Sequence, residues 1–247
     1  MAVTTAVILA AGMGTRLKEL GKLAPKGFLQ LGTIPIVEES VIKLLACNIQ
    51  RIIIITGHLS EFYEQLQKRY PQNIITIHNP KYACSGSMYS LYCARSWLND
   101  DFILLESDLI YEKRALENVL NFPKENVILL SEKTNAGDEV YVETSGEIII
   151  GMSKNLEKFT NKPTGELVGI SLISKFLFQQ MLQYAENYFS HTLSIDYETD
   201  TLVSIAQSYA VYYKVASNLI WAEIDDANHL DRAKSLIYPK IILKDIF

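Results

Sequence analysis

The amino-acid sequence predicts an α/β protein in which helices sandwich a mostly parallel sheet. Apolar runs rich in β-branched residues alternate with amphipathic stretches along the first half of the chain, and this alternation is typical of parallel βαβ units. The first apolar run leads into a glycine-rich loop, as in sheets whose ligands bind beyond the carboxyl ends of the strands. With 247 residues, 49% of them hydrophobic, the chain can bury a substantial core. We therefore expect residues 1–247 to form a single domain.

The elements of the first half begin with a strand expected at residues 6–11, an uncharged run of the kind that is buried on both faces of a sheet. Four further apolar runs are expected to be strands, and the amphipathic stretches between them to be helices. Together they predict a Rossmann-like arrangement with its ligand site at the carboxyl ends of the strands. The further strands are expected at residues 51–56, 73–78, 101–106 and 126–131, and the helices at residues 34–46, 61–70, 88–98 and 113–121.

The second half of the chain changes character and predicts a β-hairpin. Residues 139–143 and 147–152 read as two strands that flank Thr-Ser-Gly. We expect this hairpin to belong to an insertion of about residues 132–170 that forms a lid over a bound ligand. Helices at residues 174–188 and 198–208, a strand at residues 211–215, the acidic turn WAEIDD and a final helix are expected to follow.

Composition and charge narrow the classes of partner. The net charge of −5 argues against a nucleic-acid surface, which normally carries a basic patch. The three cysteines have no metal-ligand spacing and are expected to be free thiols in a reducing compartment. The longest apolar runs are far too short to cross a bilayer, and no charged segment followed by a long apolar one precedes them. We expect a soluble cytoplasmic protein without nucleic-acid binding or membrane insertion.

The glycine-rich loop predicts a site for phosphates. Gly12 and Gly14 allow the backbone to approach a ligand closely, successive amides can form an anion-binding nest, and Arg16 and Lys26 add positive charges. The loop lacks the Gly-Lys-Ser/Thr ending of the Walker motif, and Leu17 stands where the dinucleotide fingerprint has its third glycine. A nucleoside triphosphate fits these features, although two glycines alone would also suit a simple turn.

Two acidic turns follow predicted strands and suggest a metal site. Asp108 lies in LLESDLIY, and Asp225 and Asp226 lie in WAEIDDANHL. A triphosphate needs charge neutralisation, which Mg²⁺ held by one or two carboxylates usually supplies. We predict Asp108 and Asp225 as the Mg²⁺ ligands and Asp226 as a helix cap. The alternative for Asp108 is also a helix cap, because aspartate favours that position.

The segments LAAGMGTRL and PKGFLQLG resemble the signature of nucleotidyltransferases that join a nucleoside monophosphate to a phosphorylated sugar, alcohol or related molecule. The similarity in outline extends over most of the chain. It implies that an acceptor oxygen attacks the α-phosphorus of the nucleotide in line and that pyrophosphate leaves. It also implies two catalytic residues: Lys26, which stabilises charge on the α-phosphate, and Arg16, which orients the β- and γ-phosphates. Asp108 and Asp225 match the two aspartates that hold the metal in this family.

The nucleotide is implied by a second resemblance. The segment NPKYACSGSMYSLYCA is similar to one found in the phosphocholine cytidylyltransferases, which implies CTP as the nucleotide donor. The residues themselves leave cytosine and uracil open, because the two bases differ at a single ring position. The resemblance implies nucleotide contacts from Leu9, Ala10, Ala11, Gly12, Met13, Gly14, Thr15, Asn79 and Ser90.

The acceptor is predicted from departures from the choline pattern. Gly86 and Ser87 stand where the phosphocholine enzymes tend to carry paired asparagines, and Glu198 and Thr199 stand where they tend to carry Tyr-Trp. Quaternary ammonium groups are held by aromatic faces, whereas a primary ammonium donates hydrogen bonds to carboxylates and hydroxyls. The chain therefore resembles the cytidylyltransferases that activate 2-aminoethylphosphonate, and the small turn at Gly86 suits a compact phosphonate. The predicted acceptor residues are Ser85, Ser87, Lys154, Glu166, Asp196, Glu198 and Asp200.

Several alternatives remain open at this stage. The acceptor could be phosphocholine or a sugar phosphate, and a non-catalytic nucleotide-binding module could keep the same loop. Asp196, Glu198 and Asp200 could form only a solvated helix start, and Lys154 could be an exposed surface lysine. The apolar C-terminal segment IYPKIILKDIF could pack on the domain, form a homodimer or continue into a fused partner.

Overall fold

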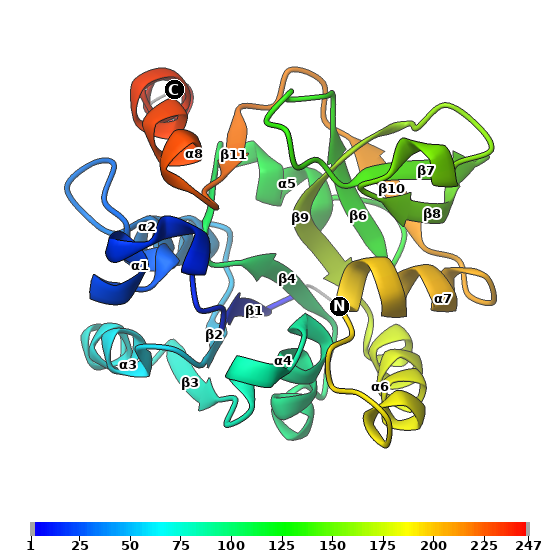
Figure 1. Cartoon of the computed structure of the whole chain (residues 1–247), viewed down its shortest axis with the longest axis horizontal. Coiled ribbons are helices and arrows are strands. Elements are labelled where there is room, and N and C mark those ends of the chain that lie inside the picture. The colour runs from blue at the N-terminus through cyan, green and yellow to red at the C-terminus, as the bar shows by residue number, and fades with distance from the viewer. Residues whose placement is uncertain (1–2, 246–247) are drawn as a thin grey trace.

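The computed structural model describes residues 3–245, which contain a nine-stranded sheet of order β3-β2-β1-β4-β9-β6-β10-β8-β7 (Figure 1). Four consecutive strands at one side of the sheet are parallel, as expected from the βαβ pattern. Their carboxyl ends lie at one edge of the sheet, where the glycine-rich loop leaves β1. The four parallel strands are β1 (Thr5–Ala10), β2 (Arg51–Thr56), β3 (Ile74–His78) and β4 (Phe102–Glu106).

The sheet as a whole is mixed, which corrects the expectation of a mostly parallel one. Strand β9 (Gly165–Ile173) lies between β4 and β6 (Val127–Ser131) and runs antiparallel to both. All nine residues of β9 are buried, and a strand covered on both faces reads as the same continuous apolar run in either direction. An apolar pattern therefore carries no information on the direction of such a strand.

The predicted hairpin is present with a small shift in its bounds. It consists of β7 (Tyr141–Ser145) and β8 (Ile148–Ser153), joined by a turn at residues 146–147 rather than by Thr-Ser-Gly. The hairpin extends the main sheet, because β8 also pairs with β10 (Tyr212–Val215) and β7 also pairs with β9. A role for the hairpin as a lid stays a prediction.

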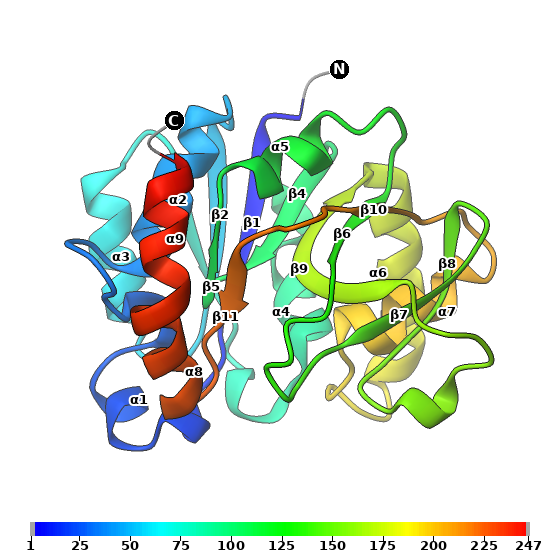
Figure 2. The same cartoon turned by 90° about the horizontal axis from the view of Figure 1, so that it is seen from above.

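Helices cover both faces of the sheet, and two apolar cores result (Figures 1 and 2). Successive residues of β1 alternate between the cores: Ala6 and Ile8 belong to one, and Val7 and Leu9 to the other. The first core is closed by α2 (Ile36–Ala46), α3 (Ser60–Arg69) and α5 (Arg114–Leu120), and the second by α4 (Ser87–Cys93), α6 (Lys175–Phe189) and α7 (Val203–Ala206).

The helices differ from expectation mainly at their ends. The helix expected over residues 88–98 ends at Cys93 and is followed by a 3-10 turn at Arg95–Trp97. The helix expected over residues 198–208 begins with a wide π-type turn at Tyr197–Leu202 before α7. Such irregular turns satisfy backbone groups with spacings that side-chain periodicity does not report.

The C-terminal part of the chain packs beside α2 and, through Ala233 and Ile241, forms a third, smaller apolar cluster with residues such as Ile36. A two-stranded sheet pairs β11 (Trp221–Glu223) antiparallel with β5 (Leu109–Tyr111). Beyond β11 come α8 (Ala227–Arg232) and α9 (Tyr238–Asp245), and α9 lies beside α2 (Figure 2). The Tyr238 hydroxyl donates to Glu39 over 2.6 Å, and Lys43 pairs with Asp245 over 2.9 Å. Among the described residues no helix is both long and apolar enough to span a membrane.

Candidate active site

The glycine-rich loop and the two predicted metal-binding aspartates meet beyond the carboxyl ends of β1, β4 and β11. Nζ of Lys26 lies 2.8 Å from Oδ2 of Asp108 and also contacts Oδ1 of Asp225. Asp108 is 6% exposed and Asp225 1% exposed. Burial disfavours the Lys26 charge, but the two carboxylates raise its pKa above the usual value. Burial likewise opposes the charge of Asp225, and Lys26 nevertheless holds the pKa of that carboxyl below its usual range.

Glycine residues allow two close approaches at this site. A Cβ at Gly27, directly after Lys26, would lie 2.9 Å from the Tyr63 hydroxyl and 3.0 Å from the Ser107 carbonyl oxygen. A Cβ at Gly86 would lie 2.2 Å from the carbonyl oxygen of Ile195. Real Cβ atoms do not come this close, so both positions require glycine. The small turn at Gly86 thus has a packing reason that is independent of any ligand.

Arg16 lies at the entrance of the site with its side chain 55% exposed. Its Nη2 is 2.7 Å from Oδ1 of Asp225, and its Nη1 is 3.9 Å from Oδ2 of Asp138. Arg16 and Lys26 therefore converge on Asp225 from opposite sides of the loop. A guanidinium that is half exposed keeps the freedom to turn toward an incoming phosphate.

A cavity of about 230 Å³ opens above these side chains. Of the predicted nucleotide residues, Leu9 to Gly12 and Ser90 line it, whereas Met13, Gly14 and Thr15 lie in the loop beyond its wall. Arg16, Lys26, Asp108 and Asp225 also line it, as do Ser85 and Ser87, which were predicted to contact the acceptor.

Asn79 is brought to the site without lining the cavity. It is 0% exposed, and its Nδ2 donates to Oγ of Ser85 and to Oγ of Ser90, each over 3.0 Å. Both hydroxyls belong to the cavity wall. Asn79 therefore positions two wall residues, and its own contact with the nucleotide stays a prediction.

A second cavity of about 320 Å³ adjoins the first and shares Arg16, Ser87, Glu106 and Glu223 with it. Part of its wall comes from the predicted insertion, through residues 134–140 before β7 and through Lys154 after β8. Of the predicted acceptor residues, Ser87, Lys154, Glu166, Asp196 and Glu198 line this cavity.

Asp200 is not among the residues that line either cavity. Its side chain is used within the turn that carries it, where Oδ2 accepts the backbone N–H of Asp196 over 2.8 Å. Asp196 in turn accepts from the backbone N–H and the hydroxyl of Ser87 over 3.3 and 3.1 Å. A contact of Asp200 with the acceptor stays a prediction, and the hydrogen bond within its turn fits the helix-start alternative.

Two carboxylates that sequence reasoning missed, Glu106 and Glu223, lie between the two cavities. Carboxylate oxygens of Glu106, Asp108 and Glu223 lie within 4.8 Å of one another. Burial raises the pKa of Glu223 to about 9 and of Glu198 to about 7, with neighbouring carboxylates adding to the effect, and burial also raises the pKa of Glu106. A signal was present, because both missed residues stand two positions before a predicted metal ligand, in Glu-Ser-Asp and Glu-Ile-Asp.

Glu166 lies across the second cavity from these carboxylates. Its carboxylate accepts the backbone N–H of Thr134 over 2.6 Å and the Thr134 hydroxyl over 3.0 Å. Burial raises the pKa of Glu166 to about 7, against the opposing effect of these hydrogen bonds. Arg232 donates to the carbonyl oxygen of Thr134 over 3.0 Å, so α8 and β9 together hold the segment before β7.

Asp226 caps α8, as predicted. Its Oδ1 accepts the backbone N–H of His229 over 2.9 Å, and this bond lowers the pKa of Asp226.

We expect Asp226→Ala to lower the free energy of unfolding by about 1 kcal/mol at neutral pH. Because the folded pKa lies below the unfolded one, the stabilisation is complete above the unfolded value and is lost as pH falls through the folded value. Urea melts at pH 7 and near pH 3 measure it. The exposed Asp231→Ala, in the same helix, is the control for loss of a carboxylate, and equal losses in Asp226→Ala at both pH values would contradict the assignment.

Comparison with known proteins agrees with this geometry. The MobA-like NTP transferase domain family matches residues 6–191. The choline-phosphate cytidylyltransferase of Streptococcus pneumoniae is 30% identical over 181 residues, which cover 69% of this chain and 75% of that protein. The 2-aminoethylphosphonate cytidylyltransferase of Lancefieldella rimae is 32% identical over 108 residues, which cover 43% of this chain and only 44% of that protein.

Solved structures support the fold. The inositol-1-phosphate CTP transferase from T. maritima superposes with a TM-score of 0.83 at 19% identity and covers 99% of this chain and 97% of that one. At this identity the likeness shows the Rossmann-like α/β fold. The family match, which spans most of the chain, shows more: the chain belongs to the MobA-like NTP transferase family and is a nucleotidyltransferase.

Proposed function

We propose that this chain transfers the cytidylyl group of CTP to 2-aminoethylphosphonate. An oxygen of the phosphonate attacks the α-phosphorus of CTP, a new P–O bond forms, the bond to the bridging oxygen of the β-phosphate breaks, and pyrophosphate leaves with the electron pair. The acceptor oxygen is already anionic, so the reaction requires no general base. Support comes from the cytidylyltransferases among the relatives and from the charges that surround the two cavities.

The first cavity is the proposed CTP site. It lies beyond the carboxyl ends of the parallel strands, where α/β sheets bind ligands, and the backbone of residues 10–12 lines it. Lys26 and Arg16 supply the charges for the phosphates. In this proposal the ammonium of Lys26 moves from Asp108 and Asp225 to the α-phosphate, where it stabilises the charge that develops as pyrophosphate leaves.

Asp108 and Asp225 are the proposed Mg²⁺ ligands. The two carboxylates lie close enough together to bind one cation, because a single cationic atom, Nζ of Lys26, contacts an oxygen of each. Carboxylates are also the hard oxygen ligands that Mg²⁺ prefers. When bound, the ion would neutralise charge on the triphosphate and on the leaving pyrophosphate.

The acceptor assignment is carried by one observation, the group of partly buried carboxylates Glu106, Glu198 and Glu223 beside the second cavity. Burial and repulsion by neighbouring carboxylates raise the pKa of each, so a cation placed among them reduces this electrostatic cost. A primary ammonium is such a cation and can donate a hydrogen bond to each carboxylate. Lys154, which lines the same cavity, carries the opposite charge and suits the phosphonate.

Phosphocholine is the second candidate acceptor, favoured by the 30% identity to the Streptococcus pneumoniae enzyme. A quaternary ammonium has no N–H to donate and is bound best by several aromatic faces. Among the described residues that line the second cavity, Trp221 is the sole aromatic one, and its Nε1 donates to Oγ of Ser131 over 2.9 Å. The chemistry of the wall therefore favours the primary amine.

Pyrophosphate release tests the proposal. CTP and UTP are each paired with 2-aminoethylphosphonate, phosphocholine or a hexose 1-phosphate in the presence of Mg²⁺. We expect the highest kcat/KM for CTP with 2-aminoethylphosphonate. Faster turnover of phosphocholine would overturn the acceptor assignment, faster turnover of UTP would overturn the nucleotide assignment, and nucleotide binding without pyrophosphate would indicate a binding module.

A single substitution separates amine recognition from nucleotide binding. Glu198→Gln keeps the shape of the side chain and its hydrogen bond from the Tyr197 hydroxyl, which is 2.6 Å long, but removes the negative charge. We expect kcat/KM for 2-aminoethylphosphonate to fall by about 10- to 100-fold, the usual effect of losing one charge-assisted hydrogen bond, with no change in the KM for CTP. The exposed Glu186→Gln, on α6, is the matched control. An unchanged acceptor KM and kcat in Glu198→Gln would remove Glu198 from the amine site.

A further inference from the structure

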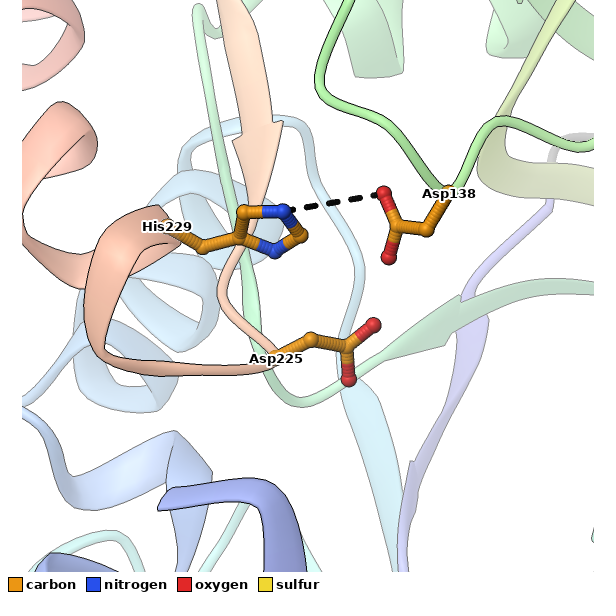
Figure 3. A group of neighbouring side chains, drawn as sticks. All are labelled: Asp138, Asp225 and His229. Atoms are coloured by element: carbon orange, nitrogen blue, oxygen red, sulfur yellow. Dashed lines mark ion pairs between the residues drawn. The ribbon is translucent and has the colours of Figure 1, made fainter.

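Three side chains from distant segments converge beside the proposed Mg²⁺ site. Asp138 comes from the loop before β7, Asp225 follows β11, and His229 lies in α8 (Figure 3). One potential metal-ligand atom of each lies within 4.8 Å of those of the other two. Figure 3 shows the carboxylates of Asp138 and Asp225 pointing toward one another, with the imidazole ring of His229 turned toward the space between them. Neither Asp138 nor His229 has a part in the proposed cytidylyl transfer.

Each of these residues keeps one buried polar atom without a hydrogen-bond partner among the described residues: Oδ2 of Asp138, Oδ2 of Asp225 and Nδ1 of His229. Buried polar atoms are nearly always satisfied, and the Asp225 side chain is only 1% exposed. Neighbouring cations do not supply a partner for Oδ2 of Asp225, because Arg16 and Lys26 both contact the other oxygen, Oδ1. Within residues 3–245, the cation that pairs with Asp138 Oδ2 is Arg16, whose Nη1 lies at the long distance of 3.9 Å.

The tautomer of His229 is set by its other nitrogen. Nε2 lies 3.3 Å from the carbonyl oxygen of Ala136 and 3.8 Å from Oδ1 of Asp138. Both neighbours are acceptors, so Nε2 carries the proton and donates it. In that tautomer Nδ1 is the unprotonated nitrogen and carries a free lone pair. An imidazole held by a carbonyl or carboxylate on one nitrogen, with the other nitrogen free, is the arrangement found at metal-binding histidines.

We propose that Asp138, Asp225 and His229 bind one divalent transition-metal ion, at a site separate from that of the Mg²⁺ held at Asp108. Two carboxylate oxygens and one imidazole nitrogen suit ions such as Co²⁺, Mn²⁺ or Zn²⁺, whereas Mg²⁺ prefers oxygen ligands alone. Asp225 takes part in both sites: its Oδ1 contacts Lys26, and its Oδ2 is the oxygen that has no hydrogen-bond partner among the described residues. The ion neutralises the two facing carboxylates and supplies a partner to all three buried atoms.

The site also has a structural consequence. Asp138 belongs to residues 134–140, which form part of the wall of the second cavity, while His229 belongs to the C-terminal helical segment. A bound ion ties these two segments to the strand end that carries Asp225. It thereby fixes the part of the cavity wall to which Asp138 belongs.

Binding of Co²⁺ to the full chain in the absence of substrates tests the proposal. Equilibrium dialysis with visible absorption is expected to give one Co²⁺ per chain with the d–d bands of a nitrogen-ligated ion. His229→Ala and Asp138→Asn should each lose that ion and its bands. His191→Ala, which removes an exposed imidazole after α6, and Asp108→Asn, which removes the proposed Mg²⁺ ligand, should retain both.

A second measurement observes the bound ion in the unmodified chain and uses His229→Ala only to assign the signals. In ¹H–¹⁵N spectra of the unmodified chain, Zn²⁺ is expected to shift the ring nitrogens of one of the four histidines, the one whose signals are absent in His229→Ala. Absence of any histidine-dependent Co²⁺ band, or Co²⁺ binding that persists in His229→Ala, would overturn the proposal. So would loss of the ion in Asp108→Asn alone. Because no substrate is present, each of these results is independent of the acceptor assignment.

Discussion

Lys26→Ala is expected to lower kcat by about 10³-fold, the effect of removing one preorganised charge from a transition state. The buried ammonium is held within reach of the triphosphate by Asp108 and Asp225, and no other lysine lines the first cavity among the described residues. The loss should appear in kcat and kcat/KM alike, because the developing charge on the α-phosphate exists only in the transition state. Steady-state pyrophosphate release with CTP and 2-aminoethylphosphonate measures it.

The same substitution leaves Asp108 and Asp225 as neighbouring buried charges without their cation. We therefore expect a lower Tm with a folded chain, and partial recovery of Tm on addition of Mg²⁺. The matched control is Lys22→Ala, whose ammonium is exposed and pairs only with Glu19, over 2.7 Å. Near-normal turnover in folded Lys26→Ala would remove Lys26 from the catalytic site.

Asp108→Asn is the substitution with the second largest expected effect. It keeps the shape of the side chain and removes one of the two charges that Mg²⁺ requires. We expect kcat to fall by about 10²-fold or more, in line with the loss of one electrostatic contact to the reacting phosphates, and the Mg²⁺ concentration for half-maximal rate to rise. Titration of the rate with Mg²⁺ at saturating CTP separates the two effects.

Asp100→Asn, an exposed residue just before β4, serves as the control for a change of net charge. If Asp108→Asn has the same rate and the same Mg²⁺ dependence as the unsubstituted chain, Asp108 is not a metal ligand. A loss of rate without a change in the Mg²⁺ dependence would assign Asp108 to positioning Lys26 instead.

Local sequence patterns predicted a large part of the fold and of the candidate site. The strand at Thr5–Ala10, the glycine loop and the aspartates after β4 and β11 were readable because each follows a short apolar run within a few residues. Parallel strands bring their carboxyl ends to one edge, so residues far apart in sequence were correctly expected to meet there. The cap at Asp226 could also be predicted from local sequence, because it depends only on the three residues that follow.

What the sequence did not reveal depends on contacts between distant segments. The antiparallel insertion of β9 between β4 and β6 has the same apolar signature as a parallel strand. Lys26 contacts Asp108 and Asp225, which lie 82 and 199 positions further along the chain. Asp138 and His229 meet only because the C-terminal helices fold back. The hydrogen bond of Asp200 within its own turn was likewise not predicted from the sequence.

The most direct test of the proposed reaction is a competition experiment. Equal concentrations of 2-aminoethylphosphonate and phosphocholine are incubated with CTP, Mg²⁺ and the unsubstituted chain, and the products are followed by ³¹P NMR, which separates a phosphonate–phosphate anhydride from a diphosphate. The carboxylates Glu106, Glu198 and Glu223 predict that the phosphonate anhydride with CMP forms in large excess. Predominant formation of CDP-choline would contradict the acceptor assignment, and the absence of any cytidylyl product would contradict the proposed reaction itself.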